Sequence, residues 1–425
     1  MAWRDDDPGE RMQHAARTRV LFLHPNDELY GSDRVLLNLV RGLDASRFEP
    51  YVVVGDDLGS AGLLTAELRK SAIPVFQLPL ACVRRRYLTP RGLVWFTRRL
   101  RRSVWLVADL IESQRIDVVY TNTLAVWTGA LAAARTHRAH LWHAHEIVEH
   151  PAVLRVFLRR FVPHYAQRVV CVSRATADHL LVSRRARAKG IVLYNGIAPK
   201  EWLAASGRGR IRAELGCADD DVLIGMIGRI SRFKAPDVFV EAASLLLARH
   251  PHLRFFIAGA PIPGETTMRE RVARLIAQSP APERIHLLGF REDVPDLTAA
   301  LDILVVPSRL PEPFPLVNLQ AMFAARPIVG ADRGAMREAI LDGETGLVVA
   351  SDNAPALAGA LSSLVGDPAR RAAMGAAGRR RALDNFTLEQ QLARFNDLLW
   401  RECGAPTERQ SSPIHARAPL VEHPS

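Results

Sequence analysis

The chain has 425 residues, of which 48% are hydrophobic and 24% charged, and this predicts a globular protein of two or three domains with well-developed cores. No stretch offers the roughly 18 uncharged apolar residues of a membrane span, and the segment before the first apolar run lacks the hydrophobic centre of a secretion signal. We therefore expect a cytoplasmic protein. Its four widely spaced cysteines, none in a CxxC pair, predict neither a disulfide framework nor a thiolate zinc site.

Basic residues outnumber acidic ones, which gives a net charge of +11 and a pI near 10.1. The excess is concentrated in two segments of the N-terminal half. Residues 81–115 contain nine arginines against two acidic residues, and residues 151–190 contain nine Lys or Arg against one. Because no basic-aromatic motif of a nucleic-acid-binding fold is present, nucleic acid is not an expected partner.

The first basic segment contains "RGLVWFTRRLRRSVWLVADL", in which Trp95, Phe96, Trp105 and Leu106 stand among arginines. This mixture is typical of a helix that lies on an anionic membrane surface, so residues 91–107 predict a peripheral contact with the inner face of the plasma membrane. The alternative is a solvated arginine-rich helix whose aromatic residues face the core. The sequence leaves both open.

Short β-branched runs alternate with helical stretches along the first half of the chain. Expected strands lie at 19–25, 51–55, 75–78, 117–122, 141–145, 168–173 and 191–196. They are apolar on both faces, as strands of a parallel sheet covered by helices are. The pattern predicts an α/β fold with a doubly wound parallel sheet over residues 19–200, after a disordered segment 1–18.

The alternation restarts after a linker near residue 200. Expected strands lie at 222–228, 254–259, 285–290, 303–308, 327–331 and 346–350, and helical patterns at 355–402 are expected to close this second unit. The sequence thus predicts a second Rossmann-like domain over residues 201–403 and a disordered tail at 404–425, which is rich in Pro, Ser and charge. Ligands of such sheets bind beyond the carboxyl ends of the strands, so two facing sheets predict a cleft between the domains.

Two strand-end loops of the second unit offer groups for this cleft. The loop "GRISRFKAPD" follows strand 222–228 and presents Arg229 and Lys234 before a helix expected to begin near Pro236, which suits a diphosphate. The loop "RLPEPFPLVNLQAM" follows strand 303–308, and its prolines hold Glu312 stiffly before a helix expected to begin at Pro315. A rigid carboxylate there can accept hydrogen bonds from sugar hydroxyls.

Motifs spread over residues 19–400 resemble, in their order, the retaining glycosyltransferases of family 4. They include "GSDRVLLNLVRGL" at 31–43, "HAHEI" at 143–147, "CVSRATADHL" at 171–180, "GRISRFKAPDVFVEAASLL" at 228–246 and "DGETGLVV" at 342–349. The resemblance implies the GT-B architecture, two Rossmann-like domains facing across a cleft. It also implies transfer of a sugar from a nucleoside diphosphate donor to an acceptor hydroxyl with retention of the anomeric configuration.

The resemblance assigns roles position by position. Glu312 matches the first glutamate of the family signature and would contact the donor sugar, whereas Gln320 replaces the second, which binds the ribose. Arg229 and Lys234 match the pair that neutralises the diphosphate. His145 matches a histidine that reaches the reacting sugar; Gly31 and Ser32 match a turn near phosphate or acceptor. The implied donor site is Gly228, Arg229, Lys234, Glu312, Phe314, Pro315, Leu316 and Gln320.

No metal ion or other cofactor is expected. Four histidines occur within 140–150, but "HEIVEH" is one residue off the HExxH zinc pattern, and no acidic DxD-type metal loop adjoins it. The leading prediction is therefore a metal-independent glycosyltransferase that builds surface polysaccharide or glycolipid on a glycan or lipid-linked acceptor. Two alternatives stay open: a non-catalytic homologue that binds nucleotide sugar, because Gln320, Pro313 and Pro315 depart from the signature, and a nucleotide-sugar epimerase on the same fold.

Overall fold

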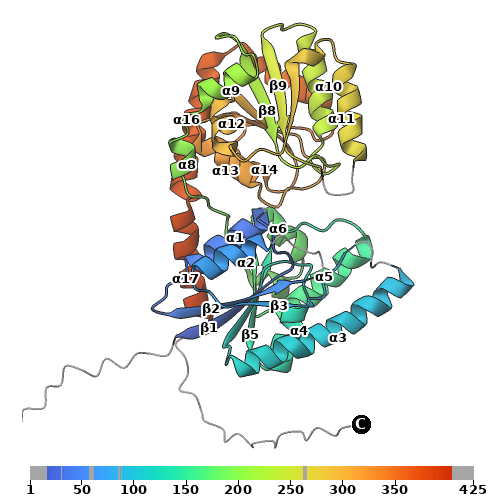
Figure 1. Cartoon of the computed structure of the whole chain (residues 1–425), viewed down its shortest axis with the longest axis vertical. Coiled ribbons are helices and arrows are strands. Elements are labelled where there is room, and N and C mark those ends of the chain that lie inside the picture. The colour runs from blue at the N-terminus through green and yellow to red at the C-terminus, as the bar shows by residue number, and fades with distance from the viewer. Residues whose placement is uncertain are drawn as a thin grey trace, which may run out of the picture.

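In the computed structural model, the described residues are 17–29, 31–56, 62–84, 87, 89–261 and 266–403, and they form two lobes stacked along the long axis of the molecule (Figure 1). The segments expected to be disordered lie almost wholly outside this range: residues 1–16 and 404–425 are not described. Among the described helices, none combines the length and apolarity needed to cross a bilayer.

The first lobe is built on a parallel sheet with strand order β3-β2-β1-β4-β5-β6-β7. Its strands are β1 (Thr18–His24), β2 (Phe48–Gly55), β3 (Val75–Leu78), β4 (Val118–Thr121), β5 (Ala139–Ala144), β6 (Arg168–Cys171) and β7 (Gly190–Val192). Helices cover both faces, which is why these strands are apolar throughout. The helices are α1 (Gly31–Arg41), α2 (Leu63–Lys70), α3 (Pro90–Ser113), α4 (Thr128–Arg135), α5 (Ala152–Tyr165), α6 (Arg174–Leu180) and α7 (Arg184–Arg187).

The second lobe repeats this plan with strand order β10-β9-β8-β11-β12-β13. Its strands are β8 (Val222–Ile227), β9 (Leu253–Ala258), β10 (Ile285–Gly289), β11 (Ile303–Val306), β12 (Ile328–Ala331) and β13 (Gly346–Val349). Its helices are α8 (Lys200–Leu203), α9 (Arg208–Glu214), α10 (Pro236–Leu247), α11 (Thr267–Ala277), α12 (Val294–Ala300), α13 (Leu316–Phe323), α14 (Met336–Ala339), α15 (Ala354–Val365) and α16 (Pro368–Asn385), with a 3₁₀ turn at Pro282–Arg284. All thirteen strands expected from the sequence are confirmed.

The strand order of each sheet reverses once, between β1 and β4 in the first lobe and between β8 and β11 in the second. At such a switch point the connections leave in opposite directions, so a crevice opens beyond the carboxyl ends of the two central strands. The loops that follow β1 and β4 therefore face the cleft from one lobe, and those that follow β8 and β11 face it from the other. These four loops carry most of the predicted site residues.

The last helix, α17 (Leu388–Cys403), does not close the second lobe as expected. It runs down beside the first lobe (Figure 1), where Phe395 and Leu399 are fully buried in a core shared with β1. Asn396 accepts a hydrogen bond from the Asp44 N–H at 2.8 Å and donates one to the Gly42 carbonyl at 2.8 Å. The helix thus ties the last described residues to the N-terminal lobe.

A carboxylate from the second lobe also joins the two halves. Glu338 on α14 accepts hydrogen bonds from the Arg174 N–H at 2.8 Å and the Ala175 N–H at 2.7 Å, two donors of the first turn of α6 that have no acceptor within that helix. It accepts a third bond from the Tyr194 hydroxyl at 2.9 Å. These hydrogen bonds therefore hold the carboxyl ends of the strands in the two sheets opposite one another.

Candidate functional site

A chain of hydrogen bonds crosses the switch point of the first lobe. His145, which follows β5, donates from Nε2 to the Asn122 Oδ1 at 3.0 Å, and Asn122 donates from Nδ2 to the His24 Nδ1 at 3.2 Å. His24 in turn donates from Nε2 to the Asp33 Oδ1 at 2.6 Å. We refer to Asp33, His24, Asn122 and His145 as the histidine chain. It links the ends of β1, β4 and β5 to the start of α1.

The histidine chain fixes the state of its outer member. Because Asn122 accepts from His145 and donates to His24, the network assigns the proton of His145 to Nε2 and leaves the lone pair on Nδ1. Burial, with a smaller effect of the neighbouring His24, lowers the pKa of His145 to about 3. His145 is therefore an uncharged imidazole at neutral pH.

Glu146 also belongs to this end of the first lobe, although the sequence analysis did not single it out. It accepts hydrogen bonds from the Thr123 hydroxyl, from the Leu124 N–H at 3.0 Å and from the His145 N–H at 3.1 Å. Burial raises the pKa of its carboxyl group. Glu146 lines a cavity of about 160 Å³ together with the predicted Ser32. The sequence signal that could have identified Glu146 was its position directly after His145, at the end of a strand.

The second lobe places the two predicted charges against each other. Lys234, before α10, donates to the Glu312 Oε1 at 2.6 Å, and the hydroxyl of Ser308, after β11, donates to the same oxygen. The Glu312 side chain is only 4% exposed, whereas that of Lys234 is 24% exposed. The structure thus brings together the two strand-end loops that the sequence analysis singled out. Glu312, however, is more deeply buried than a carboxylate exposed at the N-terminus of a helix would be.

The main chain around this pair is packed too closely for side chains. At Gly334, with φ of 62°, a Cβ would stand 2.1 Å from the Glu312 carbonyl oxygen. At Gly259, with φ of 153°, a Cβ would stand 1.9 Å from the Gly228 carbonyl oxygen. Two backbone segments therefore meet at each point, which fixes the loop of Glu312 and brings the ends of β8 and β9 together. The side chain of Lys234 also passes close to this turn, since a Cβ on Gly228 would stand 3.9 Å from the Lys234 Cε.

The remaining predicted residues differ in their surroundings. Phe314 is buried against Tyr194 and Phe386, with ring centroids 5.1 and 5.4 Å away, so its ring lies in the core. Helix α13 begins at Leu316 with Pro315 as its N-cap, one residue later than expected. Gly31, the first residue of α1, faces Leu316 across the cleft: a Cβ on Gly31 would stand 3.8 Å from the Leu316 Cδ1. Gln320 is partly exposed on α13.

A cavity of about 560 Å³ spans the two lobes, a size within the roughly 300–1,000 Å³ of pockets that hold small molecules. Its second-lobe wall includes the predicted Gly228 and Arg229. The sequence analysis missed its other polar lining, which is Asn26, Glu28 and Arg84 from the first lobe and Arg291 from the second. Asn26 and Arg84 also line the smaller cavity beside Glu146, so the two spaces adjoin. All four missed residues follow strands or precede helices at the cleft.

Of the histidines of residues 140–150, His143 and His145 are in contact, with ring centroids 3.9 Å apart, whereas His140 has other partners. His140 bonds to the Thr121 hydroxyl at 2.9 Å and to the Tyr165 carbonyl at 3.3 Å, away from the histidine chain. Within the described part of the chain, no three His, Cys, Asp or Glu side chains are grouped as metal ligands. Metal independence stays a prediction that needs its own experiment.

Comparison with known proteins identifies the family. The sequence profile of "Glycosyltransferase Family 4" matches residues 30–201, and that of "Glycosyl transferases group 1" matches residues 207–381. The chain is 30% identical over 274 residues to the lipopolysaccharide core biosynthesis mannosyltransferase LpsB of Rhizobium meliloti, covering 59% of this chain and 76% of LpsB. The chain therefore belongs to the family 4 glycosyltransferases. It is also 36% identical over 209 residues to a D-inositol 3-phosphate glycosyltransferase of Kineococcus radiotolerans, covering 46% of this chain and 48% of that protein.

Solved structures agree on the fold of this glycosyltransferase. HepE of Anabaena, in complex with UDP and glucose, superposes with a TM-score of 0.76 over 90% of this chain and 99% of HepE, at 22% identity. Sucrose-phosphate synthase from Thermosynechococcus elongatus superposes with a TM-score of 0.73 over 91% of this chain and 99% of its own, at 18% identity. The architecture is therefore GT-B, as the resemblance implied.

Proposed function

We propose that this glycosyltransferase moves a sugar, with retention of configuration, from a nucleoside diphosphate sugar to a hydroxyl of a glycan or lipid-linked acceptor in surface polysaccharide or glycolipid biosynthesis. The observation that carries the proposal is the cavity between the lobes, with Gly228 and Arg229 on one wall and Asn26 and Arg84 on the other. UDP is the first nucleotide to test, since HepE binds it.

The second lobe would hold the donor. The guanidinium of Arg229 and the ammonium of Lys234 would contact the diphosphate and stabilise the charge that develops on it as the sugar leaves. Among the described residues, Lys234 and Ser308 both donate to Oε1 of the Glu312 carboxylate, so Oε2 is the oxygen that we assign to a hydroxyl of the donor sugar. Gln320 would accept one hydrogen bond from the ribose.

The first lobe would hold the reacting face of the sugar. His145 is uncharged and its Nδ1 carries a lone pair, so it would accept a hydrogen bond from a sugar hydroxyl. The acceptor oxygen would attack the anomeric carbon on the face from which the diphosphate departs. An oxygen of the departing phosphate would take the acceptor proton. No carboxylate nucleophile and no metal ion is needed in this scheme.

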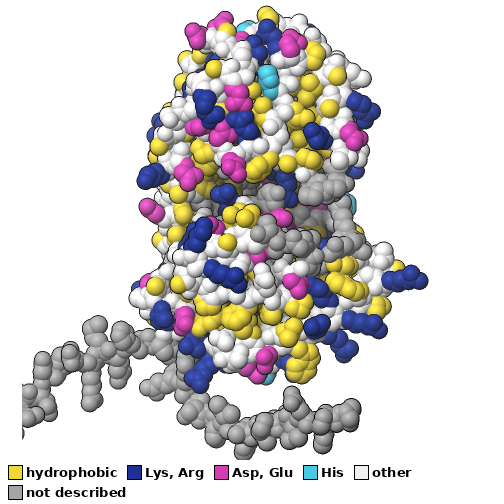
Figure 2. Space-filling view, viewed as in Figure 1, with side chains coloured by type: hydrophobic (Ala, Val, Ile, Leu, Met, Phe, Trp, Pro, Cys, Tyr) yellow, Lys and Arg dark blue, Asp and Glu magenta, His cyan; other side chains and the backbone are white. Residues whose placement is uncertain are grey.

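Helix α3 supplies the support for peripheral membrane association. Leu93, Val94, Trp95 and Trp105 are between 42% and 59% exposed, while Phe96 is buried, so the helix is apolar on its outer face as well as its inner one. Lys and Arg side chains project among hydrophobic ones over this part of the lower lobe (Figure 2). We propose that α3 rests on the anionic inner face of the plasma membrane.

A donor screen tests the sugar transfer. The full chain is incubated with UDP-, GDP- and dTDP-sugars, with and without a lipid-linked or glycan acceptor, and release of the nucleoside diphosphate is measured. Release that requires the acceptor is expected, and it persists in EDTA if no metal takes part. Conversion of the donor without release of the diphosphate would indicate an epimerase, and binding without any turnover would indicate a non-catalytic homologue.

A further inference from the structure

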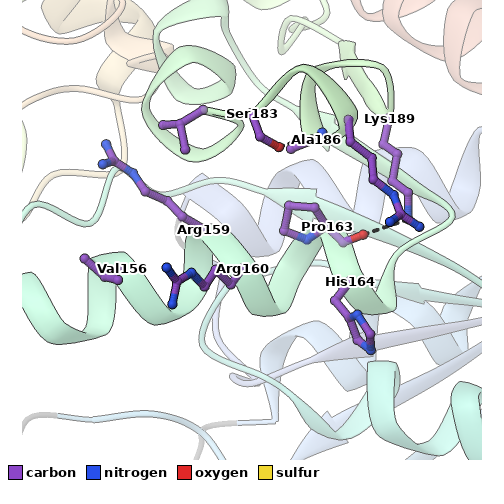
Figure 3. A pocket seen from close by; sticks show the side chains of 10 residues that line it. Val156, Arg159, Arg160, Pro163, His164, Ser183, Ala186 and Lys189 are labelled. Carbon is purple, nitrogen blue, oxygen red and sulfur yellow. Dashed lines mark hydrogen bonds between the residues drawn. The ribbon is translucent and has the colours of Figure 1, made fainter.

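The second basic segment of the sequence forms a pocket on the first lobe, away from the cleft. Its walls come from α5 and from the segment around α7, as Figure 3 shows with Arg159, Arg160 and His164 on one side and Ser183 and Lys189 on the other. The hollow has a volume of about 500 Å³. We call it the basic pocket. It shares no lining residue with either cavity of the cleft.

The basic pocket is positively charged. Arg159, Arg160, Arg185 and Lys189 line it, and none of the ten described residues that form its walls is acidic. Arg159 donates to the His179 carbonyl at 2.8 Å, and Lys189 donates to two carbonyl oxygens at the end of α5, both at 2.7 Å. These two cations are held by main-chain carbonyl dipoles, which leave their formal charge in place. Burial first, and then Arg185 and Arg168, lower the pKa of Lys189, as a site of positive potential would.

An apolar edge adjoins the basic pocket. Val153 is 82% exposed, Val156 47% and Phe157 39%, and these residues lie along α5 at helical spacing together with Arg160. Val182 on the opposite wall is 48% exposed. The ring of Phe157 lies 4.8 Å from that of Trp127, which in turn contacts Phe96 of α3 at 5.4 Å. The apolar edge of α5 is therefore connected through Trp127 to the buried face of α3.

We propose that the basic pocket binds the phosphate of an anionic membrane phospholipid while Val153, Val156 and Phe157 enter the interfacial layer of the bilayer. Arginine guanidinium groups match phosphate oxygens in charge and geometry. A soluble phosphate compound would use the cations but not the apolar edge, whereas a lipid at a bilayer surface uses both. The pocket would add a headgroup site to the membrane contact proposed for α3, and it does not depend on sugar transfer.

Vesicle co-sedimentation of the full chain tests this site. Vesicles of phosphatidylcholine alone are compared with vesicles that also contain phosphatidylglycerol. The test variant combines Arg160→Gln with Arg185→Gln, and the matched control combines Arg249→Gln with Arg380→Gln, which removes two exposed charges from the second lobe. Binding to anionic vesicles is expected to weaken roughly 30-fold in the test variant, since each basic residue near the surface contributes about a factor of five, and about twofold at most in the control.

Four further measurements distinguish a lipid headgroup from free phosphate, and failure of the lipid site from failure of sugar transfer. Val153→Ser with Val156→Ser should also weaken vesicle binding, and inorganic phosphate should displace the protein no better than chloride at equal ionic strength. Equal binding by the test and control variants, or displacement by phosphate together with unchanged binding of the serine variant, would overturn the lipid site. Loss of binding only in an Arg98→Gln, Arg101→Gln variant would leave α3 as the sole contact. Diphosphate release in solution reports the sugar transfer independently, and it should be the same in the pocket variants.

Discussion

The two lobes meet the cleft with different chemistry. At the switch point of the first lobe, the histidine chain joins a carboxylate, two imidazoles and an amide, and its outer member, His145, is uncharged at neutral pH. At the switch point of the second lobe, a buried carboxylate and an ammonium form an ion pair 2.6 Å long, and Arg229, from the same loop as Lys234, lines the cavity between the lobes. The contrast would suit the two parts of the proposed donor, a diphosphate that needs charge and a sugar that needs oriented hydrogen bonds.

The largest effect on turnover is expected from a substitution of Glu312 in the second lobe. Glu312→Gln keeps the shape of the side chain but removes the charge that Lys234 contacts and weakens the bond to the sugar, so we expect turnover to fall at least about 100-fold, the usual result of deleting one preorganised electrostatic contact. Donor affinity, measured by calorimetry, should change much less, because the diphosphate contacts remain. Turnover equal to that of the wild type would show that the carboxylate is structural only.

Removing either cation of the second lobe should lower the affinity for the donor more than it lowers the rate of the chemical step. Arg229→Ala and Lys234→Ala each remove a charge-assisted contact, which corresponds to about 1.5–3 kcal/mol and to a loss of roughly 10- to 150-fold in donor affinity. Arg232→Ala is the matched control, because Arg232 is exposed on the same loop. If both variants bind UDP-sugar as tightly as the control, the diphosphate does not lie at this end of β8.

Substitutions of Asn122, the central amide of the histidine chain, test how this chain orients His145. Asn122→Ala leaves the His24 Nδ1 and the His145 Nε2–H without their partner inside the protein, which should cost about 1–3 kcal/mol of the free energy of unfolding, as measured by urea denaturation. Asn122→Asp keeps the acceptor for His145 and should lose less turnover than the alanine variant. Two variants with identical kinetics would mean that the orientation of His145 is set elsewhere.

The uncharged state of the buried histidines in the first lobe can be measured as a dependence of stability on pH. Burial lowers the pKa of His145 to about 3 and that of His140 to about 4, so the unfolded chain takes up protons near pH 6.5 that the folded chain does not. Stability should therefore fall as the pH falls, by about 1.4 kcal/mol per unit for each such histidine below pH 6.5. Glu146, whose pKa is raised by burial, acts in the opposite direction.

The variant His145→Gln provides the control for this dependence. It should retain the contribution of His140 and lose that of His145, so the slope between pH 6.5 and 5.5 should become shallower. An unchanged slope would place the titration in other groups and would leave His145 accessible to protons, contrary to its burial in the cleft wall.

The smallest change is expected at the altered signature position. Gln320→Glu restores a charged acceptor on α13 for the ribose, and charge-assisted hydrogen bonds are roughly twice as strong as neutral ones, so donor affinity should rise a few-fold or stay the same. Calorimetry with the best donor from the screen measures it. A marked loss of affinity would show that the amide of Gln320 donates a hydrogen bond in the bound state.

The sequence by itself determined the secondary structure and the loops of the site. All thirteen strands follow from short β-branched runs, and the two-lobe fold follows from their alternation with helices, because these are local properties of the chain. The strand-end rule also located the loops of Lys234, Glu312 and His145, since ligands of parallel sheets bind beyond the carboxyl ends of their strands. The family motifs named the residues within those loops.

Only the tertiary structure decided which side chains meet. Lys234 and Glu312 are 78 residues apart, and His24 and Asn122 are 98 apart, so neither pairing leaves a periodic trace in the sequence. Helix α17 has the same helical pattern whichever lobe it covers, and its contacts with Gly42 and Asp44 span more than 350 residues. Four of the nine basic residues of 151–190 likewise line one pocket only because α5 and the segment around α7 fold next to each other. Local patterns set what each segment becomes, while long-range packing sets which of its charges lie together.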